Sequence, residues 1–319
     1  MKPTIPLLAL MLAGCTQPAA PGGGGIVSTN PCADAMLVEL VPANRIAAIS
    51  HYSVQADASS MSLAVARRFA TTAGTAEEVI GLHPDLVVTS SFTPPATLAA
   101  YQRAGLKVLT LDSPVTIAAS EAQIRTLAAA LGAQEQGEAM VARIEKAASE
   151  AAPCLPLPLG EGRGPSRSDG KGEGRAFAPT IAASQADPHP SGATRLPPSP
   201  TGRGIVCPSA LLFIAGDLAN GTGTLLDELM TRAGFRNAAA DYGLHFTGGL
   251  PIETIAAHPP RVILAPDASR TAILRTRVLA RTGAIVTEAN FPRRLVNCGG
   301  PAIIPALQHL SEVRRSLGS

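Results

Sequence analysis

Histidine, cysteine and tyrosine are the side chains of this 319-residue chain that could hold a metal ion or take part in catalysis, and it has six, five and three of them. They lie closest together at His51 and Tyr52, which Ser53 follows. Imidazole nitrogens and phenolate oxygens are ligands of iron, and His245 could approach the same ion from a distant segment. A histidine on a loop is more often a hydrogen-bonding partner than a ligand, so we expect no directly bound metal and no cofactor.

Signatures of hydrolytic and phosphate-binding enzymes are absent from the sequence. It has no GxSxG and no HExxH motif, and Gly172 follows Lys171 where a phosphate loop needs serine or threonine. Ser53 with His51 is the one pair that suggests a nucleophile and its base, but residues two apart on a loop seldom form such a pair. We therefore expect a protein that is not an enzyme.

The composition argues against several classes of function. A formal net charge of +2, with neither a basic nor an acidic tail, does not favour nucleic-acid binding. Aromatic residues make up 3% of the chain and tryptophan is absent, which disfavours sites that stack sugars or bases. Beyond the first fifteen residues, no apolar run approaches the roughly 20 residues that span a bilayer.

The first residues indicate export. Lys2 precedes an apolar stretch from Ile5 to Leu12, and the sequence LAGC then ends at Cys15. This box resembles the lipobox of bacterial lipoproteins, whose cysteine is acylated. The resemblance implies a signal peptide at residues 1–14, a lipid on Cys15, a flexible tether at residues 15–24 and a periplasmic protein that is anchored to a membrane through its lipid alone.

Four further cysteines, Cys32, Cys154, Cys207 and Cys298, could form disulfides in the oxidising surroundings of an exported protein. Two bonds among them can be arranged in three ways. Cys32 and Cys298 each precede an expected helix, where a thiol is more reactive, so we favour a bond between these two. The alternative is a pair of reduced, half-buried thiols. A zinc site is less favoured because the chain has no CxxC motif.

Short β-branched runs alternate with helical segments before residue 153, a pattern that predicts a parallel sheet covered by helices. A second alternation of the same kind follows residue 204. The expected strands are Gly25–Ser28, Arg45–Ile49, Asp85–Thr89, Lys107–Asp112, Ala210–Ala215, Val262–Ala265 and Ala284–Val286. The expected helices are Ala33–Leu40, Ser60–Phe69, Thr75–Leu82, Pro95–Ala104, Thr224–Ala233, Pro251–Ala257 and Pro301–Leu317.

The segment between the two alternations has two parts. Val115–Ala152 favours helix apart from a break near Gly132, and its second part would extend roughly 30 Å. Residues 153–204 hold ten prolines and nine glycines, a composition that cannot form a packed core and predicts a disordered insertion. We therefore expect an N-terminal α/β lobe at 25–132, a connecting helix at 133–152, the insertion at 153–204 and a C-terminal α/β lobe at 205–319.

The two lobes share a short sequence pattern. The segment Glu77–Val88 aligns without gaps to Glu253–Leu264, and in both a glutamate lies seven residues before a proline at a helix-to-strand junction. Chance similarity between two such junctions is the alternative explanation. Because the two segments also match at Glu77 and Glu253, a structural relationship between the lobes is the more interesting explanation of the shared pattern.

The chain resembles the iron/cobalamin periplasmic-binding family, the solute receptors of ABC importers for ferric siderophores, haem and cobalamin. The likeness is carried by RIAAIS, AEEVIGLHPDLVVTSS, LAAYQRAGLKVLTLD, LLDELMTRAGFRNAA and LPIETIAAHPPRVILAP. It implies two Rossmann-like α/β lobes bridged by one long helix, a ligand cleft between them and an ABC permease with its ATPase as partners. It also implies that Glu77 and Glu253 dock on permease arginines. Glu78 competes with Glu77 for that role, and solvated glutamates favoured by the helix dipole are the alternative.

The ligand cleft is expected at the loops that follow the carboxyl ends of the strands. No arginine lies on the first lobe's loops, which favours a neutral or bulky ligand such as cobalamin. A monomeric receptor for a metal chelate or cobalamin is the main hypothesis; a zinc or manganese receptor and a lipoprotein enzyme are the alternatives. The expected cleft residues are Asn30, His51, Tyr52, Ser53, Ser91, Phe92, Thr93, Asp217, Tyr242, His245 and Phe246.

Overall fold

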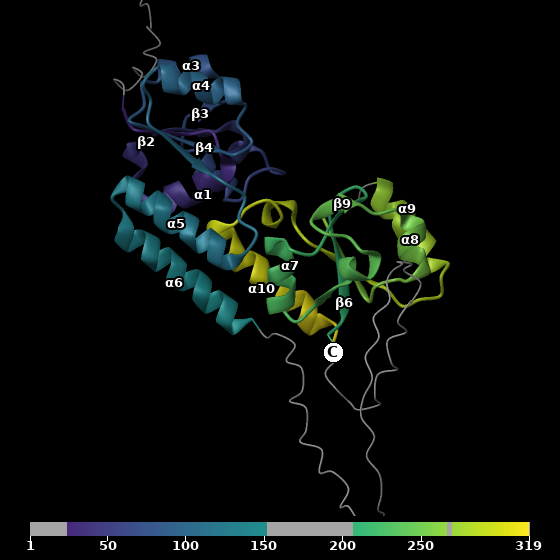
Figure 1. The fold of residues 1–319 in the computed structure, drawn as a ribbon. Coiled ribbons are helices and arrows are strands. Elements are labelled where there is room, and N and C mark those ends of the chain that lie inside the picture. The colour runs from purple at the N-terminus through teal and green to yellow at the C-terminus, as the bar shows by residue number, and fades with distance from the viewer. Residues whose placement is uncertain (1–23, 152–206, 267–269, 319) are drawn as a thin grey trace, which may run out of the picture. The chain divides into compact units, whose positions relative to one another are not determined.

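The computed structural model describes residues 24–151, 207–266 and 270–318. The predicted signal peptide, Cys15, nearly all of the predicted tether and the predicted insertion at 153–204 lie outside the described residues. The described chain forms the two α/β lobes that the sequence predicts, each built around its own sheet (Figure 1).

The first lobe has a five-stranded parallel sheet in the order β3-β2-β1-β4-β5. Its strands are β1 (Ile26–Ser28), β2 (Ile46–Ser50), β3 (Thr71–Thr72), β4 (Leu86–Ser90) and β5 (Val108–Leu111). Its helices are α1 (Pro31–Leu40), α2 (Leu63–Ala66), α3 (Ala76–Gly81) and α4 (Pro95–Arg103), with short 3-10 turns at η1 (Ala43–Arg45) and η2 (His51–Val54).

Neighbouring residues of each central strand point to opposite faces of this sheet, and both faces are covered. Ile26 and Val88 pack in a cluster with Leu37 of α1. Val27 and Val87 belong to a second cluster, with side chains of α3 and α4. A strand buried on both faces must be apolar at every position, which is why these strands read as continuous hydrophobic runs.

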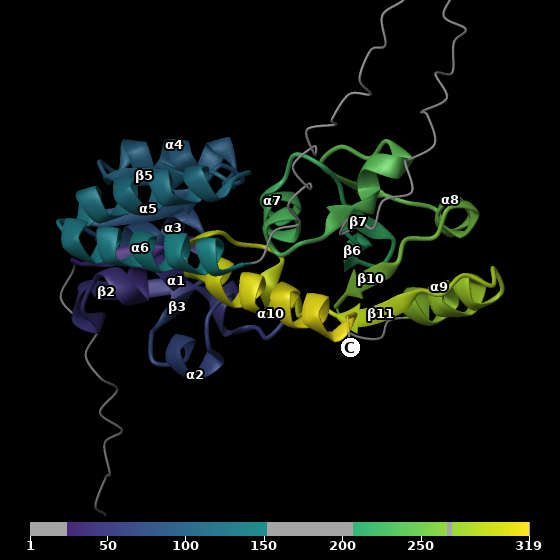
Figure 2. The ribbon, with the colours of Figure 1, turned by 90° about the horizontal axis from the view of Figure 1, so that it is seen from below.

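The second lobe repeats this plan and adds an antiparallel extension. Strands β8, β6, β10 and β11 are parallel, while β7 runs antiparallel to β6 and β9 antiparallel to β7 (Figure 2). The strands are β6 (Ser209–Ala215), β7 (Leu218–Asn220), β8 (Arg236–Asn237), β9 (Thr247–Gly249), β10 (Val262–Ala265) and β11 (Thr287–Asn290). The helices are α7 (Leu225–Arg232), α8 (Ile252–Ala257), α9 (Arg270–Ala280) and α10 (Ile303–Ser316), with 3-10 turns η3 (Ala238–Tyr242), η4 (Arg293–Leu295) and η5 (Gly300–Ala302).

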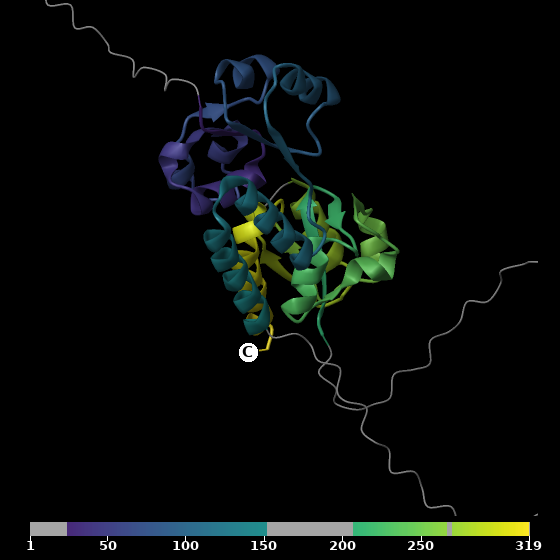
Figure 3. The same ribbon diagram turned by 60° about the vertical axis from the view of Figure 1, so that its left-hand side comes forward.

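The helical segment after the first lobe is a pair of helices, α5 (Ile117–Leu131) and α6 (Gln134–Glu150). They separate at the predicted break, where Gly132 adopts a left-handed conformation with φ of 68° and caps α5. The two helices pack side by side, and α6 also contacts α1 of the first lobe and α10 of the second (Figure 3). Helix α6 thus contacts both lobes.

The repeated sequence pattern corresponds to a repeated structural unit. Helix α3 and strand β4 begin at residues 76 and 86, and α8 and β10 begin at 252 and 262, so both elements are offset by 176 residues. Strand β4 lies between β1 and β5, and β10 lies between β6 and β11, which are equivalent places in the two sheets. The alignment of Glu77 with Glu253 therefore reflects related positions in the fold and not chance similarity.

Two predicted elements need correction, and several observed elements were not predicted. The last strand is Thr287–Asn290 instead of Ala284–Val286, because Thr287 pairs with Val262 and the preceding residues form the turn around Gly283. The helix expected at Ser60–Phe69 is only four residues long, α2. Helix α9 and the antiparallel strands β7 and β9 were not predicted, since short glycine-containing strands carry little periodic signal.

A buried carboxylate joins helix α1 to the end of β2. Asp34 has no exposed surface, and its Oδ2 accepts hydrogen bonds from Ser50 N at 2.9 Å and from the Ser53 hydroxyl at 2.6 Å. Its Oδ1 has no hydrogen-bond partner. Burial raises the pKa of Asp34 to about 7, although the hydrogen bonds from serine and backbone groups act in the opposite direction.

This raised pKa predicts a pH-dependent stability that Asp34→Asn removes. Between about pH 4 and pH 7 the Asp34 carboxyl holds a proton in the folded chain that it has released in the unfolded chain. Its contribution to the free energy of unfolding is therefore lost as the pH rises. The slope is at most about 1.4 kcal/mol per pH unit. Chemical denaturation from pH 4 to pH 8 should show Asp34→Asn gaining stability relative to the wild type as the pH rises to 7.

Asp85→Asn is the matched control, because the exposed Asp85 carboxylate also accepts a backbone hydrogen bond, from Gly25 N at 2.7 Å. Its stability should follow the wild-type pH dependence. Parallel curves for the wild type and Asp34→Asn would contradict the assignment of a protonated Asp34.

Candidate functional site

The predicted site residues of the first lobe do follow the carboxyl ends of its strands, but they differ in what their side chains do. Asn30, after β1, is buried, and its Oδ1 accepts a hydrogen bond from Cys32 N at 3.0 Å, which caps helix α1. Ser91, after β4, donates its hydroxyl to Asp112 at 2.7 Å. The Thr93 hydroxyl contacts that of Thr89. These polar groups order the loops of this edge.

Ser53 does not line a binding surface, and this prediction was wrong. The residue has no exposed surface, and its hydroxyl is held by Asp34. Residues His51–Val54 form a 3-10 turn, which directs the serine inward while its neighbours stay accessible. A buried, carboxylate-bound serine is also unavailable as a nucleophile, which removes the basis of the lipoprotein-enzyme alternative.

His51 and Tyr52 form an accessible ring pair at the end of β2. Their ring centroids lie 4.0 Å apart at an interplanar angle of 37°. The Nδ1 atom of His51 lies 3.3 Å from the carbonyl oxygen of Thr72, an arrangement in which Nδ1 donates and leaves Nε2 as an acceptor. Tyr52 is 48% exposed. The pair therefore presents one aromatic surface and one basic nitrogen.

Three loops at this edge each expose one large apolar side chain. Tyr52 follows β2, Phe92 follows β4 and is 79% exposed, and Val115 follows β5 and is 50% exposed. Val115 was not predicted, since it begins the segment 115–152 that was expected to be helical. Because the carboxyl ends of parallel strands meet at one edge of the sheet, these three side chains share that edge. Exposed apolar groups gathered in this way mark a ligand or protein contact.

In the second lobe, the predicted residues divide between an accessible loop and packed positions. His245 Nδ1 lies 2.8 Å from the Thr222 hydroxyl, and Phe246 beside it is 63% exposed. Tyr242 donates its hydroxyl to the carbonyl of His258 at 2.7 Å, and burial raises its pKa to about 12. Asp217 lies exposed in the turn between β6 and β7. His245 and Phe246 are thus the accessible side chains, and Tyr242 is a neutral structural donor.

A close backbone contact fixes the loop that carries His245 and Phe246. Gly221 N donates to the carbonyl of Phe246, and a Cβ atom at position 221 would lie 1.9 Å from that oxygen. Phe246 itself has a positive φ of 58°. Only glycine permits this approach, so the loop holds Phe246 in its exposed position through the backbone.

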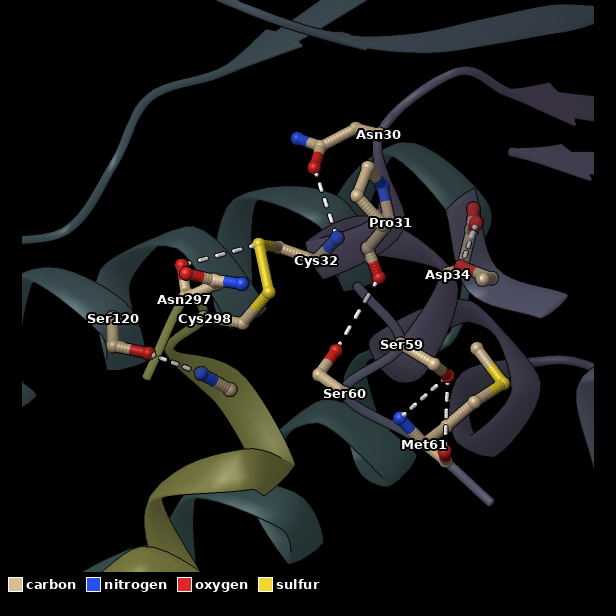
Figure 4. Close-up of a disulfide and its surroundings, with 12 residues drawn as sticks. Asn30, Pro31, Cys32, Asp34, Ser59, Ser60, Met61, Ser120, Asn297 and Cys298 are labelled. Atoms are coloured by element: carbon tan, nitrogen blue, oxygen red, sulfur yellow. Dashed lines mark hydrogen bonds between the residues drawn. A yellow bond between two sulfur atoms is a disulfide. The ribbon is translucent and has the colours of Figure 1, made fainter. Parts of the chain in front are cut away.

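A disulfide and hydrogen bonds from Gly300 and Ile117 connect the lobes within the described residues, and we call this set the interlobe seam. Cys32 in α1 is bonded to Cys298, with Cα atoms 5.2 Å apart, as predicted (Figure 4). Gly300 N donates to Ser120 Oγ at 2.7 Å, and Ile117 N donates to Glu228 at 2.8 Å. The seam holds the segment before α10 against α1 and α5 of the first lobe.

A pocket of about 200 Å³ lies at this seam. Its first-lobe wall includes Val115, and its second-lobe wall includes Thr224 at the start of α7 and Asn297 and Cys298 before α10. The predicted cleft residues do not line this pocket: some of them, such as Tyr52, Phe92 and Phe246, are exposed elsewhere, and others, such as Asn30 and Ser53, are buried. The seam therefore adds Asn297 and Val115 to the candidate site.

The docking glutamates predicted from the family resemblance are both accessible. Glu77 and Glu253 are exposed in the first turns of α3 and α8. Glu78, the competing residue, has a structural role, because its Oε2 accepts hydrogen bonds from the Thr72 hydroxyl and from Ala73 N, each at 2.8 Å. These hydrogen bonds lower the pKa of Glu78. The distinction favours Glu77 over Glu78 for contact with another protein.

The described residues contain no group of three or more histidine, cysteine or acidic side chains that could hold a metal ion. The alternative of a zinc or manganese receptor, which needs such a group, is thus without support in residues 24–151, 207–266 and 270–318. Within the same ranges, no helix is long and apolar enough to cross a membrane.

A comparison with known proteins matches the first part of the chain to a protein family. Residues 26–156, which span the first lobe and helices α5 and α6, match the family model described as periplasmic binding protein. This is a family of solute-binding proteins, so the prediction of a non-catalytic binding protein agrees with the comparison. No curated protein matches the chain.

Solved structures of periplasmic binding proteins share the fold of nearly the whole chain. The haem-binding protein RhuT of Roseiflexus sp. RS-1 is 18% identical to this chain, with a TM-score of 0.56. The alignment covers 92% of this chain and all of the RhuT chain. A haem-binding protein of Pseudomonas aeruginosa is 19% identical with a TM-score of 0.59, covering 91% of each chain. The vitamin B12-binding protein BtuF of Vibrio cholerae is 14% identical with a TM-score of 0.59, covering 92% of this chain and 97% of its own. At these identities the likeness establishes the fold.

The seam predicts that the double variant Cys32→Ala, Cys298→Ala is less stable than the wild type. The bond closes a loop of 266 residues, and loss of a native disulfide typically lowers the free energy of unfolding by about 2–5 kcal/mol. Chemical denaturation measures this change. Reductant should lower the stability of the wild type toward that of the double variant, and the double variant with reductant serves as the control. Equal stability of the two oxidised proteins would refute a stabilising role for this bond.

Proposed function

We propose that this protein is the substrate-binding component of an ABC importer and that it carries a bulky metal chelate, a ferric siderophore or haem, or cobalamin to an inner-membrane permease. The observation that carries the proposal is a set of exposed apolar side chains on loops of the two lobes: Tyr52, Phe92 and Val115 after the carboxyl ends of first-lobe strands, and Phe246 just before β9 in the second lobe. The fold and the family match are consistent with it.

The chemistry of these loops suits a large ligand with apolar surface better than a small hydrophilic solute. Small polar solutes are held by many converging hydrogen-bond donors, whereas here several polar groups are already engaged within the loops, as Asn30 and Ser91 are. Tyr52 and Phe92 instead offer aromatic faces. Haem and the cobalamin ring system present extended flat surfaces that such faces can cover.

The pair His51 and Tyr52 gives the first lobe a group suited to a metal centre. With Nδ1 of His51 held by the carbonyl of Thr72, its Nε2 is the basic nitrogen. The adjacent phenol of Tyr52 is half exposed. Either group can contact the metal of a bound chelate or hydrogen bond to its periphery, so the pair serves both kinds of cargo.

Glu77 and Glu253 are proposed as the contacts to the permease. They occupy equivalent positions of the repeated helix-to-strand unit, one in each lobe, and both are exposed. A pair of equivalent carboxylates suits a partner that carries arginines at two related positions. Lipid attachment at Cys15 would hold the protein at the membrane surface, where such a permease lies, and the seam disulfide fits an oxidising compartment.

Titration calorimetry with haem, cobalamin and a panel of ferric siderophores tests the cargo. We expect one of them to bind at one site per chain with submicromolar affinity. Phe92→Ser and Tyr52→Ser should weaken that binding at least tenfold, since burying an aromatic side chain contributes roughly 1.5–3 kcal/mol. Ile285→Ser is the control, because Ile285 is equally exposed, at 77%, but precedes the amino end of β11. Failure of every ligand to bind a folded sample would overturn the proposal.

A charge reversal tests the docking residues. The double variant Glu77→Arg, Glu253→Arg should abolish stimulation of ATP hydrolysis by the cognate permease and ATPase in proteoliposomes, while its affinity for cargo stays unchanged. Glu135→Arg with Glu150→Arg is the matched control, since both of these glutamates are exposed on α6. Full stimulation by the Glu77 and Glu253 variant would show that docking uses another surface.

A further inference from the structure

Arg275 on helix α9 is a charged residue that the protein buries almost completely. It is 4% exposed, although arginine is rarely buried without a partner. Its surroundings are the carboxyl ends of three strands of the second lobe: Gly216 follows β6, Pro266 follows β10, and Asn290 ends β11. No sequence signal pointed to this residue, because α9 itself was not predicted.

The contacts of the guanidinium leave its charge uncompensated within the described chain. Its Cζ lies 4.0 Å from the ring centroid of Phe213, and its Nη1 is 3.4 Å from the carbonyl oxygen of Gly216. Its Nε has no hydrogen-bond partner. No carboxylate of the described residues lies within 4.0 Å of it. Burial lowers the pKa of Arg275, which Glu288 partly offsets. A buried cation without a carboxylate partner among residues 24–151, 207–266 and 270–318 is costly, so a compensating anion is expected.

Arg275 lines a pocket of about 210 Å³ between α9 and strands β10 and β11. Most of the other lining side chains are small or apolar: Ile263, Ala265, Pro266, Ala272, Ile273 and Ala289. This volume is too small for haem or cobalamin, and it suits a ligand of a few carbon atoms. A single buried cation within apolar walls is the arrangement that binds an organic anion with a short hydrocarbon part.

The second charged group of the pocket narrows the class of ligand. Glu288 is exposed, and its carboxylate oxygens accept from the Thr276 hydroxyl at 2.7 and 2.8 Å. This negative charge lies on the wall of the same pocket. It disfavours dianions and trianions such as phosphate and citrate, because their additional charges would meet a like charge. A single carboxylate can pair with Arg275 and leave its apolar chain against the remaining walls.

We propose that the pocket beneath α9 is a binding site for a short-chain monocarboxylate, with Arg275 as its anion-binding residue. The site goes beyond the proposed transport function, because it lies within the second lobe and is too small for the proposed cargo. It is tested without any chelate present, so its failure and the failure of the transport proposal are separate results.

Butyrate is the probe, with butyramide and n-butylamine as ligands of the same shape that are neutral or positively charged. Saturation-transfer difference NMR and calorimetry on the purified protein should show millimolar binding of butyrate and at least tenfold weaker binding of the other two. Arg275→Met should lose the preference for butyrate, whereas Arg277→Met, a change at an exposed arginine of the same helix, should keep it.

Thermal denaturation without ligand separates a binding role from a structural one. Removing an unpaired buried charge should leave the Tm of Arg275→Met equal to or above that of the wild type. A Tm several degrees lower would show that the protein itself compensates the guanidinium, which would overturn the proposal. Equal binding of butyrate and butyramide, or unchanged butyrate binding by Arg275→Met, would overturn it as well.

Discussion

The interlobe seam is the constraint on which the binding site depends. Cys32 begins a helix that follows the first strand of one lobe, and Cys298 precedes the last helix of the chain, so one covalent bond links α1 to the segment before α10. Close packing supports it: a Cβ atom at Gly299 would lie 2.6 Å from Ser120 Oγ. The seam sets how the first lobe's loops meet Thr224 and Asn297. It also restricts any opening of the lobes to motions that leave the disulfide and its neighbouring contacts in place.

Duplication of one helix-to-strand unit explains why functional groups occur in pairs. A buried parallel strand must be preceded by a connection that returns to the other end of the sheet, and α3 and α8 are such connections. The same construction puts a first-turn glutamate at an equivalent exposed position in each lobe. Because α3 begins just after β3 and α8 just after β9, both glutamates lie at the carboxyl edge of their sheets, the same edge at which the first lobe's loops expose Tyr52 and Phe92.

Elements with a strong local pattern could be predicted, and weakly patterned ones could not. Strands β1, β4, β6 and β10 are continuous apolar runs because both of their faces are covered, and their predicted bounds were correct to within a residue or two. The helix break at Gly132 was also predicted correctly. The strands β7 and β9, three residues each, owe their existence to pairing with β6 and with each other. Such pairing is a tertiary contact that leaves no periodicity in the chain.

The amino-acid sequence by itself determined the two α/β lobes and most of their strands, because these follow from local patterns of hydrophobicity and of helix and strand termini. It favoured the Cys32–Cys298 pair among three possible arrangements, and the structure established that bond. Only the tertiary structure decided what individual polar side chains do. Ser53 and Tyr52 are adjacent on one loop, yet one is fixed to Asp34 in the core and the other is exposed. Arg275 resembles the exposed Arg277 two residues away, but it alone is buried against Phe213. The burial of a side chain and its hydrogen-bond partners are set when distant segments pack together. The spacing of residues along the chain therefore does not predict them.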